Sequence, residues 1–217
     1  MKRISFFAAL LLLLFATSCS QKPEVLQLFN GKDLEGWTLF ANDPAVAASD
    51  VFSVVDGNIR IAGQPFGFMR TNEKYTDVVF RAEWRWVGEG SNSGIFSLVQ
   101  DGLLCWPNAI ECQLKAGSAG DVVLLGGSDV KELDVPEGGE RPRFPVVRKE
   151  NESSEKPEGE WNLTEIVITS DGGVDITLNG VHQNHVTNKN YTEGYIALQS
   201  EGGPLEFRNV TVTRLAK

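Results

Sequence analysis

Three polar side chains at alternating positions give the first indication of chemistry in this sequence: Glu111, Gln113 and Lys115. Alternate residues of an extended chain point to the same side, so a carboxylate, an amide and an amine form one row of hydrogen-bonding groups. Such a row can line a binding pocket, or it can be the solvated face of an ordinary antiparallel strand. The spacing by itself favours the solvated face.

Two further rows share this pattern: Arg81, Glu83 and Arg85 alternate in one segment, and Gln199 and Glu201 in another. Clustered carboxylates can bind a divalent cation through oxygen, act as general acid and base, or pair with neighbouring cations. Simple ion pairing is the plainest of these alternatives. The rows form one site only if their strands share a sheet.

The elements that must position these rows are short strands separated by turns. Residues 78–87 alternate without a break, and Asp56-Gly57 and Asn179-Gly180 are strong hairpin signals. The mature chain contains roughly a dozen such candidates and no segment with a helical period. We therefore predict an all-β fold, an antiparallel two-sheet β-sandwich of the jelly-roll type.

Aromatic and cysteine residues add a candidate for sugar stacking. Trp84 and Trp86 fall in the apolar register of their strand and are expected in the core, whereas Trp106 lies in a loop and can stack on a sugar or anchor the loop. Cys105 and Cys112 are close enough in sequence to form a disulfide. A buried free thiol is the commoner state for Cys112 on an apolar strand face.

The segment 131–160 changes to charges, prolines and glycines without an apolar period. A long loop is therefore expected there, inside a single domain that spans residues 28–217. Loops of this length in compact domains are often lids or binding loops, and otherwise disordered. The composition leaves both alternatives open.

The N-terminus has the pattern of a bacterial lipoprotein. Two basic residues precede the apolar stretch 4–16, which is too short to span a bilayer, and Cys19 follows small residues. We expect a signal peptide at 1–18, lipid on Cys19 and a tether at 19–27. The segment 20–24 lacks an acidic run, which favours the outer membrane facing the periplasm, within the bacterial cell envelope.

Composition narrows the ligand classes. The formal net charge is −9, and cleavage before Cys19 would remove two basic residues, so the surface should repel nucleic acid and anionic lipid. Motifs of zinc proteases, serine hydrolases and phosphate loops are absent from the sequence. A neutral ligand such as a sugar is favoured.

Ordered sequence blocks carry a resemblance to a known family. From Leu28 to Leu215 the chain contains, in this order, LFNGKDLEGW, FRAEWRW, NSGIF, IECQLKAGSAGD, KPEGEWN, LNG and GYIALQSEGGPLEFRNV. Together they resemble the 3-keto-disaccharide hydrolase family. The resemblance implies a concanavalin A-like jelly roll, and secreted or lipid-anchored bacterial proteins that cleave glycosides whose sugar has been oxidised at C3.

The implied chemistry needs a base for the C2 proton, a cation or donor near the ketone oxygen, and an acid for the leaving oxygen. Transferred by motif, Glu111 is base or metal ligand, and Lys115 and Arg85 stabilise the oxyanion. Glu201 stands where many members have histidine, which suggests either a changed acid–base pair or a changed substrate. The implied substrate-binding residues are Glu83, Asn92, Gln113, Gln199 and Arg208, with Trp106 as the stacking candidate.

Other interpretations stay open at this point. A divalent cation, if one is used, would be held by Glu111 and Glu83. A lipid-anchored carbohydrate-binding module without catalysis is the main alternative, because jelly rolls carry many sugar binders and the fold does not fix activity.

Overall fold

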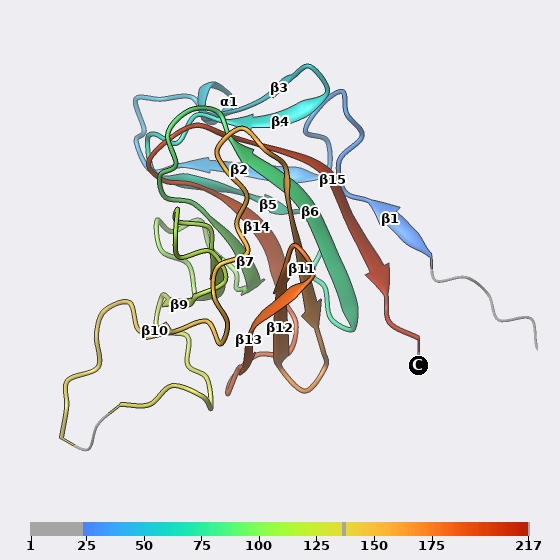
Figure 1. Ribbon diagram of the computed structural model, residues 1–217. Coiled ribbons are helices and arrows are strands. Elements are labelled where there is room, and N and C mark those ends of the chain that lie inside the picture. Colours follow the sequence, from blue (N-terminus) through green and yellow to red (C-terminus); the bar gives the residue numbers. More distant parts are fainter. Residues whose placement is uncertain (1–23, 136–137, 217) are drawn as a thin grey trace, which may run out of the picture.

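The computed structural model describes residues 24–135 and 138–216, and almost all regular structure in these ranges is β-strand (Figure 1). Two antiparallel sheets face each other, which confirms the predicted sandwich. The back sheet has eight strands, in the order β13-β12-β11-β6-β15-β4-β3 with β1 paired to β15. The front sheet has seven, in the order β10-β9-β8-β7-β14-β5-β2.

The back sheet comprises β1 (Val25–Gln27), β3 (Phe52–Val55), β4 (Asn58–Ile61), β6 (Val78–Trp86), β11 (Asn162–Ile168), β12 (Gly173–Leu178), β13 (Val181–Thr187) and β15 (Leu205–Arg214). The front sheet comprises β2 (Trp37–Ala41), β5 (Gly67–Thr71), β7 (Gly94–Val99), β8 (Ala109–Gln113), β9 (Val122–Leu125), β10 (Val146–Val147) and β14 (Tyr195–Ser200). One short helix, α1 (Ala48–Val51), precedes β3.

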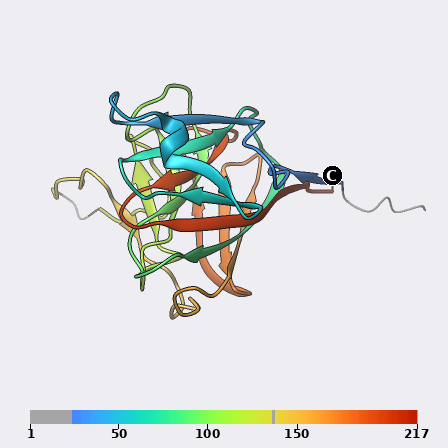
Figure 2. The same cartoon turned by 90° about the horizontal axis from the view of Figure 1, so that it is seen from above.

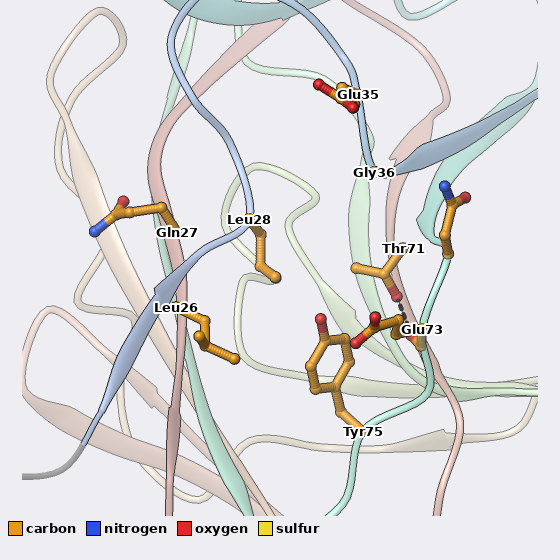
Figure 3. Close-up of a pocket in the computed structure, with 9 residues that line it drawn as sticks. Leu26, Gln27, Leu28, Glu35, Gly36, Thr71, Glu73 and Tyr75 are labelled. Carbon is orange, nitrogen blue, oxygen red and sulfur yellow. Dashed lines mark hydrogen bonds between the residues drawn. The ribbon is translucent and has the colours of Figure 1, made fainter.

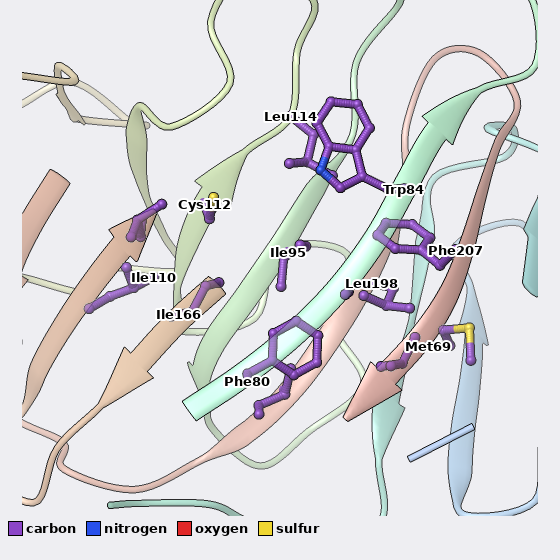
Figure 4. Close-up of a cluster of buried hydrophobic side chains, with 14 of the residues drawn as sticks. Met69, Phe80, Trp84, Ile95, Ile110, Cys112, Leu114, Ile166, Leu198 and Phe207 are labelled. Atoms are coloured by element: carbon purple, nitrogen blue, oxygen red, sulfur yellow. The ribbon is translucent and has the colours of Figure 1, made fainter. Parts of the chain in front are cut away.

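The core lies between the two sheets, as Figure 4 shows. Every second residue of β6 is buried, and Trp84 and Trp86 are both in this core, as their register predicts. From the front sheet, Ile110 and Cys112 point into the same core. Glu111 must therefore point to the outer face of the front sheet.

Two predicted hairpins have the backbone that their sequences require. Asp56 and Gly57 have φ values of 51° and 77° between β3 and β4, and Asn179 and Gly180 have 50° and 81° between β12 and β13. Consecutive positive φ angles are typical of the tightest hairpin turns, which match the twist of the flanking strands.

The N-terminal boundary differs from the prediction. Val25–Gln27 pair with β15 at Thr211–Thr213, and Figure 2 shows β1 beside the end of β15. The folded part therefore begins before residue 28, because the backbone groups of these residues find partners in the back sheet.

Cys19 and the signal peptide lie outside the described residues. No helix in the described part is long and apolar enough to cross a membrane.

The described residues of the segment 131–160, yellow to orange in Figure 1, form a long excursion with one short strand, β10, which pairs with β9. It therefore adds the edge strand to the front sheet.

Cys105 and Cys112 are both free thiols, and Cys112 is buried in the core.

Candidate active site

The outer face of the front sheet carries a second apolar cluster, separate from the core. Residues of β5, β7, β8, β9 and β14 form it, and loops cover part of it; the buried members are Phe68, Phe96, Val99, Ala109, Val123, Leu125 and Ala197. Because both faces of these strands are buried, the alternation of polar and apolar residues is weak here. A few polar side chains project from this apolar surface.

A pocket of about 260 Å³ opens on this surface. Trp106 and Phe144 from loops and Val146 from β10 form its wall, and Val123 and Leu125 form its apolar base. The polar residues that line it are Asn92, Glu111, Gln113 and Glu201. The structure thus brings together residues that are up to 109 positions apart in the chain, as far as from Asn92 to Glu201.

Glu111 is the most enclosed carboxyl group of the pocket. Its residue is 2% exposed, and Oε1 has no hydrogen-bond partner. Burial, followed by the charge of Glu201, raises the pKa of the Glu111 carboxyl well above its ordinary value. The enclosure therefore favours the protonated form of this group.

Glu201 has a different environment in the same pocket. It follows β14, and the Gln199 side-chain amide donates to its Oε2 over 2.8 Å. Burial raises the pKa of Glu201, while hydrogen bonds from Asn92 and Gln199 and the charge of Lys115 partly offset this effect. Glu201 is thus better equipped than Glu111 to carry the negative charge.

Lys115, Gln113 and Trp106 lie around this pair. Lys115 is exposed just beyond β8 and lines an adjoining hollow together with Gln113. The Gln113 side-chain oxygen accepts a hydrogen bond from the Lys115 backbone N–H at 3.0 Å. The Trp106 ring packs edge-on against Phe144, with centroids 5.1 Å apart.

Glu83, Arg85 and Arg208 do not belong to this pocket, contrary to the sequence-based prediction. They lie on the outer face of the back sheet, where Arg208 pairs with Glu83 at 2.7 Å and Arg85 with Glu206 at 2.8 Å. Both guanidinium groups also stack on Trp161, at 4.6 Å for Arg85 and 4.0 Å for Arg208. Polar and apolar residues alternate along β6 as predicted. However, β6 and β15 belong to the back sheet, whereas the pocket lies on the front sheet.

The sequence matches a family model for the 3-keto-alpha-glucoside-1,2-lyase-like domain over residues 24–213. The chain belongs to this family. The match spans nearly all described residues, including both carboxyl groups of the pocket. Membership in this lyase-like family supports a carbohydrate-processing role. A search of curated proteins found no match.

Solved structures similar to this lyase-like domain include two proteins assigned as glycosyl hydrolases from Parabacteroides distasonis ATCC 8503. One is 23% identical, with a TM-score of 0.63, and covers 88% of this chain and 94% of that chain. The other is 19% identical with a TM-score of 0.63, and covers 88% and 100%. The Bacillus licheniformis beta-glucanase is 11% identical with a TM-score of 0.57, covering 91% and 100%. At these identities the likeness shows the jelly-roll fold.

A larger hollow of the lyase-like domain, about 480 Å³, lies between β1 and the loop after β5. Figure 3 shows Glu73 and Tyr75 side by side in it, with the Thr71 hydroxyl donating to the Glu73 carbonyl at 2.7 Å. Its carboxyl groups belong to the exposed residues Glu35 and Glu73, and Tyr75 is the one aromatic residue in its lining. We therefore place the candidate site in the smaller pocket, on its chemistry rather than its volume.

The proposed metal ligands Glu111 and Glu83 lie on different sheets, so they cannot share an ion. Among the described residues no group of three or more His, Cys, Asp or Glu side chains is spaced to hold a metal. The pocket does contain oxygen atoms suited to a hard cation: besides the two carboxyl groups, Oδ1 of Asn92 is buried without a partner. Oε1 of Gln199, whose side-chain amide donates to Glu201, is also buried without a partner.

The sequence did not point to several residues of the site. Phe144 and Val146 come from the charged segment 131–160, where neither periodicity nor composition marks a functional residue. Gly94 faces the Glu111 carboxyl, and its only sequence signal is its place in the NSGIF block. These contacts arise from long-range packing.

Proposed function

We propose that this lyase-like domain cleaves 3-keto-glycosides by removal of the C2 proton, elimination of the glycosidic oxygen and later hydration. The observation that carries the proposal is the pair Glu111 and Glu201, two carboxyl groups with different environments in one pocket. Such a pair supplies an acid and a base at the same pH.

In the proposed mechanism Glu201 is the base. Its carboxylate takes the C2 proton, which the neighbouring C3 ketone makes acidic, and an enolate forms. The C1–O bond then breaks as a C1=C2 double bond forms, and Glu111 donates its proton to the departing oxygen. The products are the free alcohol and an unsaturated keto sugar, to which water adds in a second stage. These roles reverse the sequence-based assignment of Glu111 as base.

Other residues in and beside the pocket have binding roles in this proposal. Gln113 and Gln199 bind sugar hydroxyls, and Trp106 offers an aromatic surface. Lys115, which lies close enough to affect the pKa of Glu201, supplies positive charge for the enolate oxygen. A divalent cation, if the enzyme requires one, would bind to Glu111 and Glu201 with the amide oxygens of Asn92 and Gln199.

The alternative is a non-catalytic sugar-binding module, which the aromatic residues in the pocket wall, Trp106 and Phe144, favour. A carbohydrate-binding module from Bacillus subtilis shares the fold, with 13% identity, a TM-score of 0.56, and 82% of this chain and 95% of that chain covered. Incubation with 3-keto-glucosides of both anomers, with and without a chelator, separates the two functions. Release of the alcohol supports the enzyme, binding without release supports the module, and loss of release with the chelator reveals a cation.

We further propose that lipid on Cys19 holds the mature domain at the bacterial outer membrane, facing the periplasm. The support is the sequence pattern before Cys19. Replacing Cys19 with Ala should prevent incorporation of labelled palmitate and leave the protein unprocessed. Palmitate incorporation by the Cys19→Ala variant would contradict the anchor site.

A further inference from the structure

A second hollow adjoins the candidate active site. It has a volume of about 400 Å³ and is lined by Leu104, Cys105, Trp106, Gly126, Gly127, Arg143 and Phe144. Trp106 and Phe144 line both this hollow and the pocket of Glu111. A ligand whose sugar lies over Glu111 can therefore extend past these two rings into the hollow.

The lining of this hollow is mostly apolar and aromatic. Trp106 packs edge-on between Phe66 and Phe144, with centroid distances of 5.2 Å and 5.1 Å. Leu104 is 62% exposed, the highest value among the large hydrophobic side chains of the described residues. Leu104 and the rings of Trp106 and Phe144 line one hollow, and contiguous apolar surface of this kind often marks a ligand-binding site.

The polar groups available in the hollow are few. Apart from backbone atoms, the lining offers the Cys105 thiol, the Trp106 indole and the Arg143 guanidinium, which lies 5.0 Å from the centre of the Phe144 ring. A second sugar would bring several hydroxyl groups, and each hydroxyl buried without a partner weakens binding. A flat aromatic group would instead bury apolar area and pack against the rings.

We propose that this hollow is the leaving-group site and that it selects glycosides with an aromatic or apolar aglycone. This inference rests on the proposed function, because the occupant is the alcohol released by elimination. Leu104 is then a specificity-determining residue. It lines only the hollow, and not the pocket of Glu111 and Glu201.

Kinetics of the Leu104→Ser variant test the proposal. With 4-nitrophenyl 3-keto-glucoside, KM should rise about five- to tenfold, as expected for a lost apolar contact. With methyl 3-keto-glucoside, which has no group to fill the hollow, KM should stay unchanged. Leu103→Ser is the matched control, because Leu103 is the preceding residue, is 43% exposed and does not line the hollow. Equal changes for both substrates, or none for the aryl substrate, would overturn the proposal.

Calorimetric titration separates this proposal from the catalytic one. The probes are 4-nitrophenyl glucoside and methyl glucoside, neither of which carries the C3 ketone. We expect tighter binding of the aryl probe, and loss of this preference in Leu104→Ser. Equal affinities would overturn the aglycone site regardless of turnover. An aryl preference that depends on Leu104, combined with no cleavage of any 3-keto-glucoside, would keep the site and refute the proposed reaction.

Discussion

The carboxyl group of Glu111 on β8 lies directly over the α-carbon of Gly94 on the neighbouring strand β7. A Cβ placed on Gly94 would overlap Glu111, and its three nearest heavy atoms would all belong to that side chain. The absence of a side chain at Gly94 therefore creates the space in which Glu111 is enclosed. This contact links the NSGIF block to the chemistry of the pocket.

Replacing Gly94 with Ala should displace the Glu111 carboxyl group and lower kcat at least about tenfold, because misplacement of a catalytic group by a fraction of an ångström is costly. Cleavage of a 3-keto-glucoside measures the effect. The effect of the same substitution on protein stability provides the matched control. If the overlap is the cause, Gly94→Ala should destabilise the wild type more than it destabilises a Glu111→Ala background, as a double-mutant cycle would show. An equal loss of stability in both backgrounds would contradict the overlap between residue 94 and Glu111.

The pH dependence of cleavage should be bell-shaped. Glu201 must lose its proton to act as base, so activity rises as pH passes its raised pKa. Glu111 must keep its proton to act as acid, so activity falls as pH passes its own raised pKa. Glu201→Gln should lower kcat by about 10²–10⁴-fold. Glu111→Gln should also lower kcat, and it should remove the fall in activity at alkaline pH. If Glu111→Gln instead removed the fall in activity at acid pH, the roles of Glu111 and Glu201 would be exchanged.

Glu111→Gln should stabilise the protein at neutral pH. The pKa of Glu111 is raised in the folded state, so its contribution to stability is full below the ordinary pKa of 4.5 and is lost as pH rises toward the folded value. Glutamine does not titrate, and we expect Tm to rise by about 2–8 °C at pH 7, with little change at pH 4. Glu35→Gln, at an exposed position, controls for the loss of a carboxylate. A gain that is larger at pH 4 would contradict the buried acid.

Arg85→Met should affect stability and not catalysis. Arg85 pairs with Glu206, whose side chain is only 3% exposed, and its loss would leave Glu206 with Arg60 at 2.6 Å. We expect a loss of about 1–2 kcal/mol in the free energy of unfolding and kcat/KM within about twofold of wild type. Lys115→Met is the contrasting variant, with lower kcat and stability close to wild type. Thermal unfolding measures the stability of the two variants, and a cleavage assay measures their kcat. A large loss of kcat in Arg85→Met would show that Arg85 takes part in catalysis after all.

The sequence determined much of the fold because its signals are local. The alternation in β6 and β8 sets which side chains share a face, and Asp56-Gly57 and Asn179-Gly180 set tight turns. The same register put Glu111, Gln199 and Glu201 on polar faces, and the ordered blocks indicated the family that the profile match shows.

Only the tertiary structure decided which rows meet. Arg85 and Glu111 alternate equally well, yet β6 pairs with β11 and β15, while β8 pairs with β7 and β9. Sheet membership depends on contacts between distant segments, which a period of two cannot encode. The same holds for Phe144, which reaches the pocket because β10 pairs with β9. The sequence thus defines the faces, and long-range strand pairing selects the face that becomes the site.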